Sequence, residues 1–261
     1  MKVAVIGGGG REHTLAWKLA QSPSVDKLYA IPGSAAMSEV AQCVDIALSD
    51  LDAITDYAKN EGIDMLVVGP EVPLTEGIAD LAQSKGLAVF GPNKAAAQME
   101  GSKVFAKNLM KKYHVPTAAY ASFTDGDAAK AYIKEQGAPI VVKADGLAAG
   151  KGVVVAQTVE EAKAAVRAMI EDKTFGQSGA RVVIEEFMEG PEVSVLSFTD
   201  GETVVPMVSS MDHKCALDGD KGPNTGGMGT IAPNPCYTEK IADECMQTIF
   251  LPTIRAMKAE G

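Results

Sequence analysis

Short apolar runs alternate with helix-like stretches over the first 95 residues, and this alternation restricts the fold more than any other feature of the chain. The runs cover residues 3–6, 27–31, 65–68 and 87–90. Helical patterns fill the intervals near residues 12–21, 50–60 and 75–85. Strands that alternate with helices in this way form parallel sheets with crossover connections. We therefore predict a small doubly wound α/β domain at the N-terminus.

Glycine-rich or polar segments follow these runs, at the edge where an open parallel sheet binds its ligands. Gly8, Gly9 and Gly10 follow the first run and open a helix, so their backbone amides suit an anion. Arg11 can add a bidentate contact to a phosphate monoester. A nicotinamide dinucleotide is disfavoured, because Glu12 replaces the third glycine of the dinucleotide fingerprint. A tight turn with a solvated arginine is the alternative to the phosphate site.

The pattern changes after residue 100, where a helix expected over residues 102–113 precedes mixed strands and helices. A capping-box sequence at Thr158–Glu161 opens a helix near residues 159–171. That helix separates two expected strands, at residues 152–156 and 181–187. This spacing predicts an α+β module.

A glycine-rich loop at residues 145–152 follows another apolar run. It is not a Walker loop, because only three residues separate Gly146 from Gly150 and because Gly152 replaces the Ser or Thr that holds magnesium. The β-branched residues that follow favour a strand over a helix. We predict a hairpin that can close over a triphosphate, with Lys143 projecting from its first strand. A plain hairpin turn is the alternative.

Residues 212–229 combine charged side chains with a flexible backbone. The segment contains five glycines, which allow the main chain to approach a ligand closely. His213, Lys214 and Asn224 offer hydrogen-bond donors to an anion. This composition is typical of a substrate loop.

Composition excludes several other classes of protein. The formal net charge of -10 argues against nucleic acid or an anionic membrane as a partner, because both require a basic surface. No apolar run is long enough for a signal peptide or a membrane helix, so we expect a cytoplasmic protein. The four cysteines form no Cys-x-x-Cys pair and the three histidines are far apart in the sequence, which disfavours a zinc site.

Seven motifs stand in order along the chain, at residues 9–13, 69–74, 100–103, 143–152, 184–187, 212–214 and 222–229. Together they closely resemble the phosphoribosylamine-glycine ligases, or glycinamide ribonucleotide synthetases, a family of ATP-grasp enzymes. The resemblance covers residues 1–261 and implies a Rossmann-like (pre-ATP-grasp) substrate domain over residues 1–100. An α+β ATP-grasp domain would follow over residues 101–261, with its nucleotide-binding subdomain at about 115–190 and an incomplete C-terminal part.

The resemblance implies a ligation reaction in purine biosynthesis. ATP would phosphorylate glycine to glycyl phosphate, and the amine of 5-phosphoribosylamine would then displace phosphate, giving glycinamide ribonucleotide and ADP. Mg²⁺ or Mn²⁺ would accompany ATP. Such a reaction needs no protein nucleophile, so catalysis would depend on positioning and on neutralising the charge of the transferred phosphoryl group.

The resemblance also implies roles for individual residues. Lys103 and Lys143 look like the two lysines that contact phosphates, Glu185–Met188 like the adenine hinge, and Glu192 like the ribose ligand. The implied ATP-binding set is Lys103, Lys143, Asp145, Gly146, Gly150, Lys151, Gly152, Glu185, Glu186, Phe187, Met188 and Glu192. The implied substrate-binding set is Gly8, Gly9, Gly10, Arg11, Glu71, Asp212, His213, Lys214, Asn224, Thr225, Gly226 and Gly227. The implied catalytic set is Lys143, Asp212, His213 and Lys214.

Two departures from the family pattern and the length of the chain qualify this interpretation, the smaller departure being Thr230-Ile231 in place of the common Ala-Tyr. Cys215 stands where the family usually has an arginine, which removes a fixed positive charge from the substrate loop. Family members also continue well past this length, through the carboxylates that hold magnesium. We therefore expect a truncated product whose metal ligands lie beyond Gly261, and which is inactive or nearly so on its own.

Two alternatives to the ligase stay open at this point. The chain could be a nucleotide-binding fragment without catalysis, or a related ATP-grasp carboxylate-amine ligase that uses another acid. The oligomeric state also stays open, with a monomer as the expectation.

Overall fold

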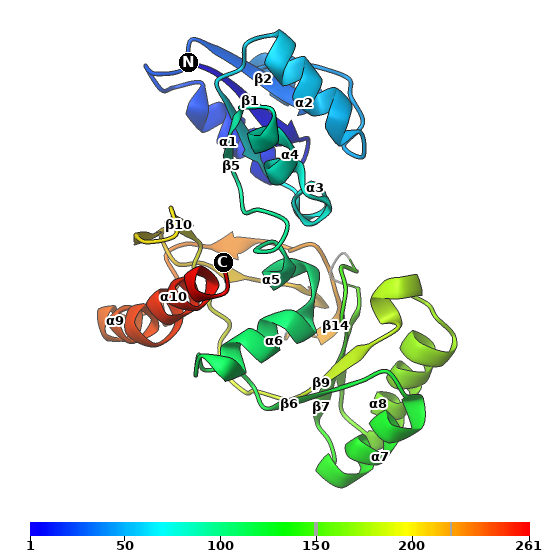
Figure 1. Ribbon diagram of the computed structural model, residues 1–261. Coiled ribbons are helices and arrows are strands. Elements are labelled where there is room, and N and C mark those ends of the chain that lie inside the picture. The colour runs from blue at the N-terminus through cyan, green and yellow to red at the C-terminus, as the bar shows by residue number, and fades with distance from the viewer. Residues whose placement is uncertain (149–150, 220) are drawn as a thin grey trace. The chain divides into compact units, whose positions relative to one another are not determined.

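The chain divides into two units, Met1–Gly101 and Ser102–Gly261, shown as ribbons in Figure 1. The computed structural model describes residues 1–148, 151–219 and 221–261. Within these residues, none of the helices has the length and apolar character that crossing a lipid bilayer requires.

A five-stranded sheet of order β3-β2-β1-β4-β5 forms the centre of the first unit, and all its neighbouring strands are parallel. The strands are β1 (Lys2–Gly7), β2 (Lys27–Pro32), β3 (Gln42–Cys43), β4 (Met65–Val68) and β5 (Ala88–Phe90). The strand order reverses between β1 and β4, where sheets of this kind open a ligand crevice. The predicted doubly wound sheet is therefore confirmed, whereas the two-residue strand β3 was not predicted.

Helices cover both faces of this sheet. They are α1 (Gly10–Leu19), α2 (Leu51–Asn60), α3 (Glu71–Glu76) and α4 (Ile78–Ser84), with a 3₁₀ turn η1 (Met37–Glu39). The short helix α5 (Gln98–Gly101) follows β5 and has no buried residue. Val3 and Val5 of β1 pack in one buried cluster with Ala16 of α1. Ala4 and Ile6 belong to a second cluster that includes residues of α2 and α4. Because both faces are buried, the strands read as continuous apolar runs instead of alternating ones.

The helix predicted at residues 75–85 is two helices in the structure. Gly77 separates α3 from α4 and has a φ of 105°, in the left-handed region that glycine adopts without a steric penalty. Helix α3 begins at Glu71, soon after β4, and Pro73 is tolerated within its first turn. Because α3 begins three residues after β4 ends, Glu71 lies at the edge of the sheet where the strands end.

The second unit contains a four-stranded antiparallel sheet of order β6-β9-β7-β8. Its strands are β6 (Tyr120–Phe123), β7 (Ile140–Ala144), β8 (Val153–Ala156) and β9 (Val182–Glu186). The associated helices are α6 (Lys103–Lys112), α7 (Gly126–Gln136) and α8 (Val159–Val166), then the π turn η2 (Arg167–Glu171) and the 3₁₀ turn η3 (Gly176–Gly179). The pairing of β7 with β8 confirms the predicted hairpin around the glycine loop.

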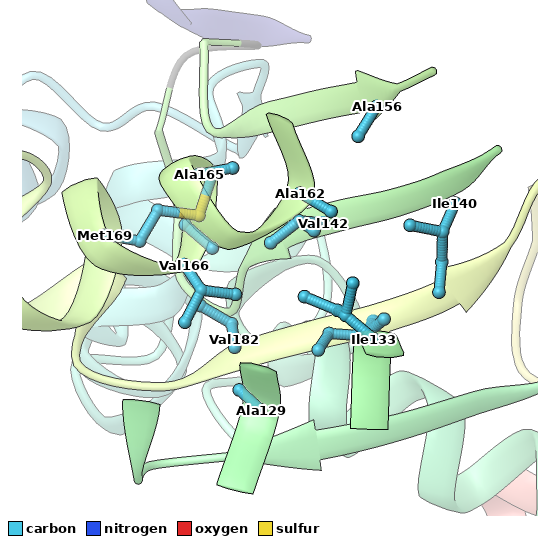
Figure 2. Packing of buried hydrophobic residues seen from close by; sticks show 12 residues of the cluster. Ala129, Ile133, Ile140, Val142, Ala156, Ala162, Ala165, Val166, Met169 and Val182 are labelled. Atoms are coloured by element: carbon cyan, nitrogen blue, oxygen red, sulfur yellow. The ribbon is translucent and has the colours of Figure 1, made fainter. Parts of the chain in front are cut away.

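One face of this sheet packs against α7 and α8. Figure 2 shows the buried cluster, in which Ile133 of α7 and Val142 of β7 take part and which also includes Ile184 of β9. Because successive side chains of a strand point to opposite faces, Lys143 and Glu185 lie on the face away from α7 and α8. The alternation thus places two charged side chains together on the second face.

The rest of the second unit consists of short antiparallel ladders and C-terminal helices. These elements are β10 (Ser197–Thr199), β11 (Val204–Pro206), β12 (Met211–Asp212), β13 (Cys215–Leu217), β14 (Lys221–Asn224), β15 (Thr230–Ile231), α9 (Glu239–Cys245), the π turn η4 (Met246–Phe250) and α10 (Leu251–Ala259). Strand β12 pairs with β15 and β13 pairs with β14, so the described residues of the 212–229 segment form two nested antiparallel ladders.

Candidate functional site

Lys143 of β7 and Glu185 of β9 form an ion pair, with Nζ 2.8 Å from Oε2. Val141 is the direct ladder partner of Glu185, so Lys143 stands two residues farther along on the same face. The side chain of Glu185 is 6% exposed and that of Lys143 is 28% exposed. A buried carboxylate requires a compensating charge, and Lys143 supplies one at the base of the glycine loop.

Lys107 of α6 contacts the same carboxylate, with its Nζ 3.4 Å from Oε1 of Glu185. Burial lowers the pKa of Lys107 and the charge of Lys143 acts in the same direction, while Glu185 opposes them. We did not predict Lys107 from the sequence. A signal was available, because Lys107 stands three residues after the buried Val104 and therefore on the apolar stripe of the helix.

Asp145 stands at the start of the glycine loop, and its side chain accepts hydrogen bonds from three residues outside the loop. Its Oδ1 accepts from the amide of Val104 at 2.7 Å and from the hydroxyl of Ser102 at 2.9 Å. Its Oδ2 accepts from Nε of Arg181 at 2.9 Å and also from Nη2. Burial alone would raise the pKa of this carboxyl, but the bonds outweigh it and hold the pKa below its ordinary value. The side chain thus anchors the loop to α6, and its contact with a nucleotide stays a prediction.

Lys103 is the first residue of α6 and lies against the glycine loop. Its amide donates to the carbonyl of Asp145 at 3.0 Å, and its Nζ donates to the carbonyl of Gly146 at 3.2 Å. A Cβ at Gly146 would fall 2.9 Å from Cα of Ser178, so only glycine fits without a shift of the backbone. A lysine at a helix N-terminus adds its charge to that of the helix dipole, which suits a phosphate.

The far end of the loop is equally close-packed. A Cβ at Gly152 would fall 2.7 Å from Cβ of Ala148, and Lys151 beside it is exposed. Gly150 lies outside the described residues. A loop of this kind fits the predicted flap over a triphosphate, and the contacts of Lys151 and Gly152 with it stay predictions.

The segment after β9 was predicted to form the adenine hinge. Glu186 is exposed, and its Oε1 accepts from the amide of Ala119 at 2.9 Å, which ties the end of β9 to the residue before β6. Phe187 and Met188 are 36% and 68% exposed. Exposed apolar side chains directly after the Lys143–Glu185 pair suit a flat base, although the hinge role itself stays a prediction.

Backbone geometry brings the two halves of the 212–229 segment together. The amide of Thr225 donates to the carbonyl of Lys214 at 2.7 Å. A Cβ at Gly227 would fall 2.8 Å from Oδ1 of Asp212, and its φ of 110° is in the left-handed region. The structure therefore groups six of the predicted substrate residues, namely Asp212, His213, Lys214, Thr225, Gly226 and Gly227.

Lys214 forms an ion pair with Glu192, which joins a predicted substrate residue to the predicted ribose ligand. Asn234, which no sequence pattern marked, is 3% exposed and donates from Nδ2 to the carbonyl of Glu192 at 2.9 Å. Asn234 thereby holds the backbone of Glu192 in place. Asn224 pairs through its backbone with Cys215, and the side chain of Asn224 is outside the description.

In the first unit, Gly8–Arg11 and Glu71 lie at the carboxyl ends of β1 and β4, on either side of the switch point. Arg11 donates from Nη2 to Oε1 of Glu71 and from Nε to Oε1 of Glu12, both at 3.1 Å. Burial alone would lower the pKa of Arg11, but these bonds to carboxylates outweigh it and raise the pKa. The predicted phosphate site therefore contains a guanidinium that two carboxylates already hold.

Glu12 is buried above the strand ends, with 5% of its surface exposed. Its Oε2 accepts from the amide of Gly9 at 2.8 Å. A Cβ at Gly69 would fall 2.3 Å from its Oε1, and a Cβ at Gly7 would fall 2.6 Å from its Cγ. Glu12 thus fills the space next to both glycines and accepts the hydrogen bond of one of the loop amides.

We expect Gly8→Ala to destabilise the first unit. The new Cβ would lie 2.4 Å from the carbonyl oxygen of Gly33, a backbone atom that cannot rotate away. The expected loss is about 1–3 kcal/mol, measured by urea denaturation with the fluorescence of Trp17, the single tryptophan. Gly10→Ala is the matched control, since a Cβ there meets nothing within 4 Å and alanine favours the helix. Equal losses for both variants would contradict the steric argument.

An antiparallel sheet with a glycine-loop hairpin, a lysine in the strand before the loop and a second lysine against it defines the ATP-grasp class of fold. Residues 101–261 match the family model of the phosphoribosylglycinamide synthetase ATP-grasp (A) domain, and residues 1–100 match that of its N domain. The chain belongs to the phosphoribosylglycinamide synthetase family.

Individual relatives agree with this assignment. A phosphoribosylamine-glycine ligase of Halalkalibacterium halodurans is 55% identical over 260 residues, which cover 100% of this chain and 61% of the relative. The crystal structure of phosphoribosylamine-glycine ligase from Thermotoga maritima superimposes with a TM-score of 0.81 at 32% identity, covering 100% of this chain and 62% of that one. The chain thus spans about three fifths of the length of these relatives.

A more distant structure shares the fold alone. The biotin carboxylase domain of Hydrogenobacter thermophilus 2-oxoglutarate carboxylase, solved in complex with MgADP, ADP and bicarbonate, has a TM-score of 0.75 at 20% identity. The comparison covers 98% of this chain and 58% of that one.

Proposed function

We propose that this chain carries the nucleotide and substrate sites of an ATP-dependent ligase that joins glycine to 5-phosphoribosylamine. The products would be glycinamide ribonucleotide, ADP and phosphate. The observation that carries the proposal is the convergence of two lysines on one glycine loop. Lys103 donates from Nζ to the carbonyl of Gly146, and Lys143 stands on the strand that leads into the loop. A lysine that contacts a glycine loop and a second lysine on the strand before that loop suit a polyphosphate.

ATP would bind to the second unit and supply the phosphoryl group that activates the glycine carboxylate. Lys103 and Lys143 would neutralise its phosphates, while residues 145–152 would cover them. Phe187 and Met188 would contact the base, and Glu192 the ribose. The MgADP complex of the similar biotin carboxylase domain supports an adenine nucleotide as the ligand of this fold.

Mg²⁺ or Mn²⁺ would accompany ATP in the complete reaction of such a ligase. In residues 1–148, 151–219 and 221–261, no group of three or more His, Cys, Asp or Glu side chains is arranged to hold a metal ion.

Two clusters would serve the other substrates. In the first unit, Gly8–Arg11 and Glu71 would take the ribosyl phosphate, whose charge can replace that of a carboxylate beside Arg11. In the second unit, the hairpin around His213 and Lys214 would face the reacting groups. Catalysis would consist of positioning and charge neutralisation, without a protein nucleophile. A biosynthetic ligase of this kind would act in the cytoplasm, and we propose a monomer.

Release of ADP from ATP tests the proposal directly. Because the chain spans about three fifths of the length of its relatives, the assay uses the chain joined to the segment that follows in those relatives. We expect release only when glycine and 5-phosphoribosylamine are both present with Mg²⁺. ATP binding without turnover under those conditions would contradict the ligase and leave a nucleotide-binding module. Turnover with another small acid in place of glycine would indicate a different carboxylate-amine ligase of the same fold.

A further inference from the structure

Three charged side chains meet on the second face of the β6-β9-β7-β8 sheet. Two of them are cations and one is an anion. The carboxylate of Glu185 lies 2.8 Å from Nζ of Lys143 and 3.4 Å from Nζ of Lys107. The carboxylate is 6% exposed, so it is largely cut off from water. Two cations therefore share one buried anion, although a single cation would be enough to compensate it.

The two lysines differ in how firmly they are held. Lys107 is 9% exposed, and its Nζ also donates to Oγ1 of Thr117 at 2.7 Å and to the carbonyl of Ala118 at 3.2 Å. The same ammonium lies 5.5 Å from the ring centroid of Tyr120. Lys143 is 28% exposed and stands at the strand end that leads into the glycine loop. Lys107 is therefore fixed in place, whereas Lys143 is close enough to solvent to turn towards a ligand.

We propose that Lys107 is a positioning residue, the permanent counter-ion of Glu185, which allows Lys143 to move its ammonium onto a nucleotide phosphate. Without Lys107, such a movement would leave a buried carboxylate uncompensated, which is strongly unfavourable. With Lys107 in place, Glu185 pairs with Lys143 in the free protein. Breaking that ion pair when a nucleotide binds then costs little free energy. The inference rests on the proposed nucleotide site.

Nucleotide binding provides the first test. By titration calorimetry of the 261-residue chain, we expect Lys107→Met to weaken ATP about 10-fold, because Glu185 then retains Lys143. Binding of adenosine, which has no phosphate, should change less than about 2-fold. Lys107→Arg keeps the charge and should retain most of the affinity. The double variant Lys107→Met/Glu185→Gln should recover ATP binding, since no carboxylate remains to retain Lys143.

A purely structural role for Lys107 would produce a different pattern, in which ATP and adenosine weaken together and the double variant does not recover. That result would overturn the proposal, as would unchanged ATP affinity in Lys107→Met. Lys111→Met is the matched control, because Lys111 is an exposed lysine on the same helix. It should bind ATP as the parent chain does.

Thermal unfolding without any ligand provides the second test, and it separates this inference from the proposed function. Lys143→Met alone should lower the melting temperature only slightly, because Lys107 still compensates the charge of Glu185. Lys107→Met/Lys143→Met should lose about 4 °C or more beyond the sum of the single losses, and Glu185→Gln should restore that excess. Additive losses would overturn the inference. If the parent chain binds no ATP, the proposed function fails, while this cycle still decides the role of Lys107.

Discussion

Lys143→Met is expected to lower the affinity of the chain for ATP by about 10- to 100-fold. A hydrogen bond to a charged group contributes about 1.5–3 kcal/mol, and about 1.4 kcal/mol corresponds to a factor of ten in affinity. Methionine keeps the aliphatic stem, so it preserves packing along β7 and removes only the ammonium. Because Lys107 remains beside Glu185, the fold should persist. Titration calorimetry with ATP and with adenosine measures the effect.

The comparison with adenosine makes this prediction specific to phosphate. Adenosine affinity should stay within about 2-fold of the parent value, because no phosphate is present to contact residue 143. Lys134→Met, an exposed lysine of α7 in the same unit, controls for the general loss of one positive charge. Equal weakening of ATP by both variants would mean that net charge, and not a specific contact, determines the affinity.

Asp145→Ala is expected to destabilise the second unit by about 2–4 kcal/mol. The substitution leaves the amide of Val104, the hydroxyl of Ser102 and the guanidinium of Arg181 without their acceptor. It also removes the side-chain hydrogen bond from Val104 of α6 that helps to hold the start of the glycine loop, so ATP binding should weaken as well. Urea denaturation followed by circular dichroism measures the stability. Asp127→Ala is the control, because the Asp127 side chain is 96% exposed.

The same carboxyl predicts a dependence of stability on pH. Burial raises the pKa of Asp145, but its hydrogen bonds outweigh burial and hold the folded-state pKa below the ordinary value. Its contribution is therefore fully present above the unfolded pKa of about 4, and it is lost as pH falls through the folded pKa. The difference in melting temperature between the parent and Asp145→Asn should shrink from pH 7 to pH 3. A constant difference would show that ionisation of Asp145 contributes nothing.

Much of the fold could be predicted because its signals are local. The apolar runs of the first unit gave the correct parallel sheet, since strands buried on both faces must be apolar throughout. The β-branched residues after Gly152 correctly predicted the β7–β8 hairpin. The break at Gly77 was missed, because a helical pattern on both sides of one glycine also suits a continuous helix.

The site was only partly accessible to sequence reasoning. Glycine loops and motifs pointed to Lys103, Lys143 and the 212–229 segment, because each of these motifs consists of residues that are neighbours in the sequence. Three further residues were missed, and each acts on a partner distant in the sequence: Lys107 on Glu185, Arg181 on Asp145 and Asn234 on Glu192. A local pattern carries no information about such partners.

The sequence by itself determined the strand and helix periods, the glycines that the backbone requires and the family to which the chain belongs, because these depend on neighbouring residues or on motifs read in order. Only the tertiary structure decided which charges meet. Lys143 and Glu185 are 42 positions apart, and they share a face because the antiparallel register of β7 and β9 aligns them. Lys107 joins them through the packing of α6, which converts an ordinary helical lysine into a buried counter-ion.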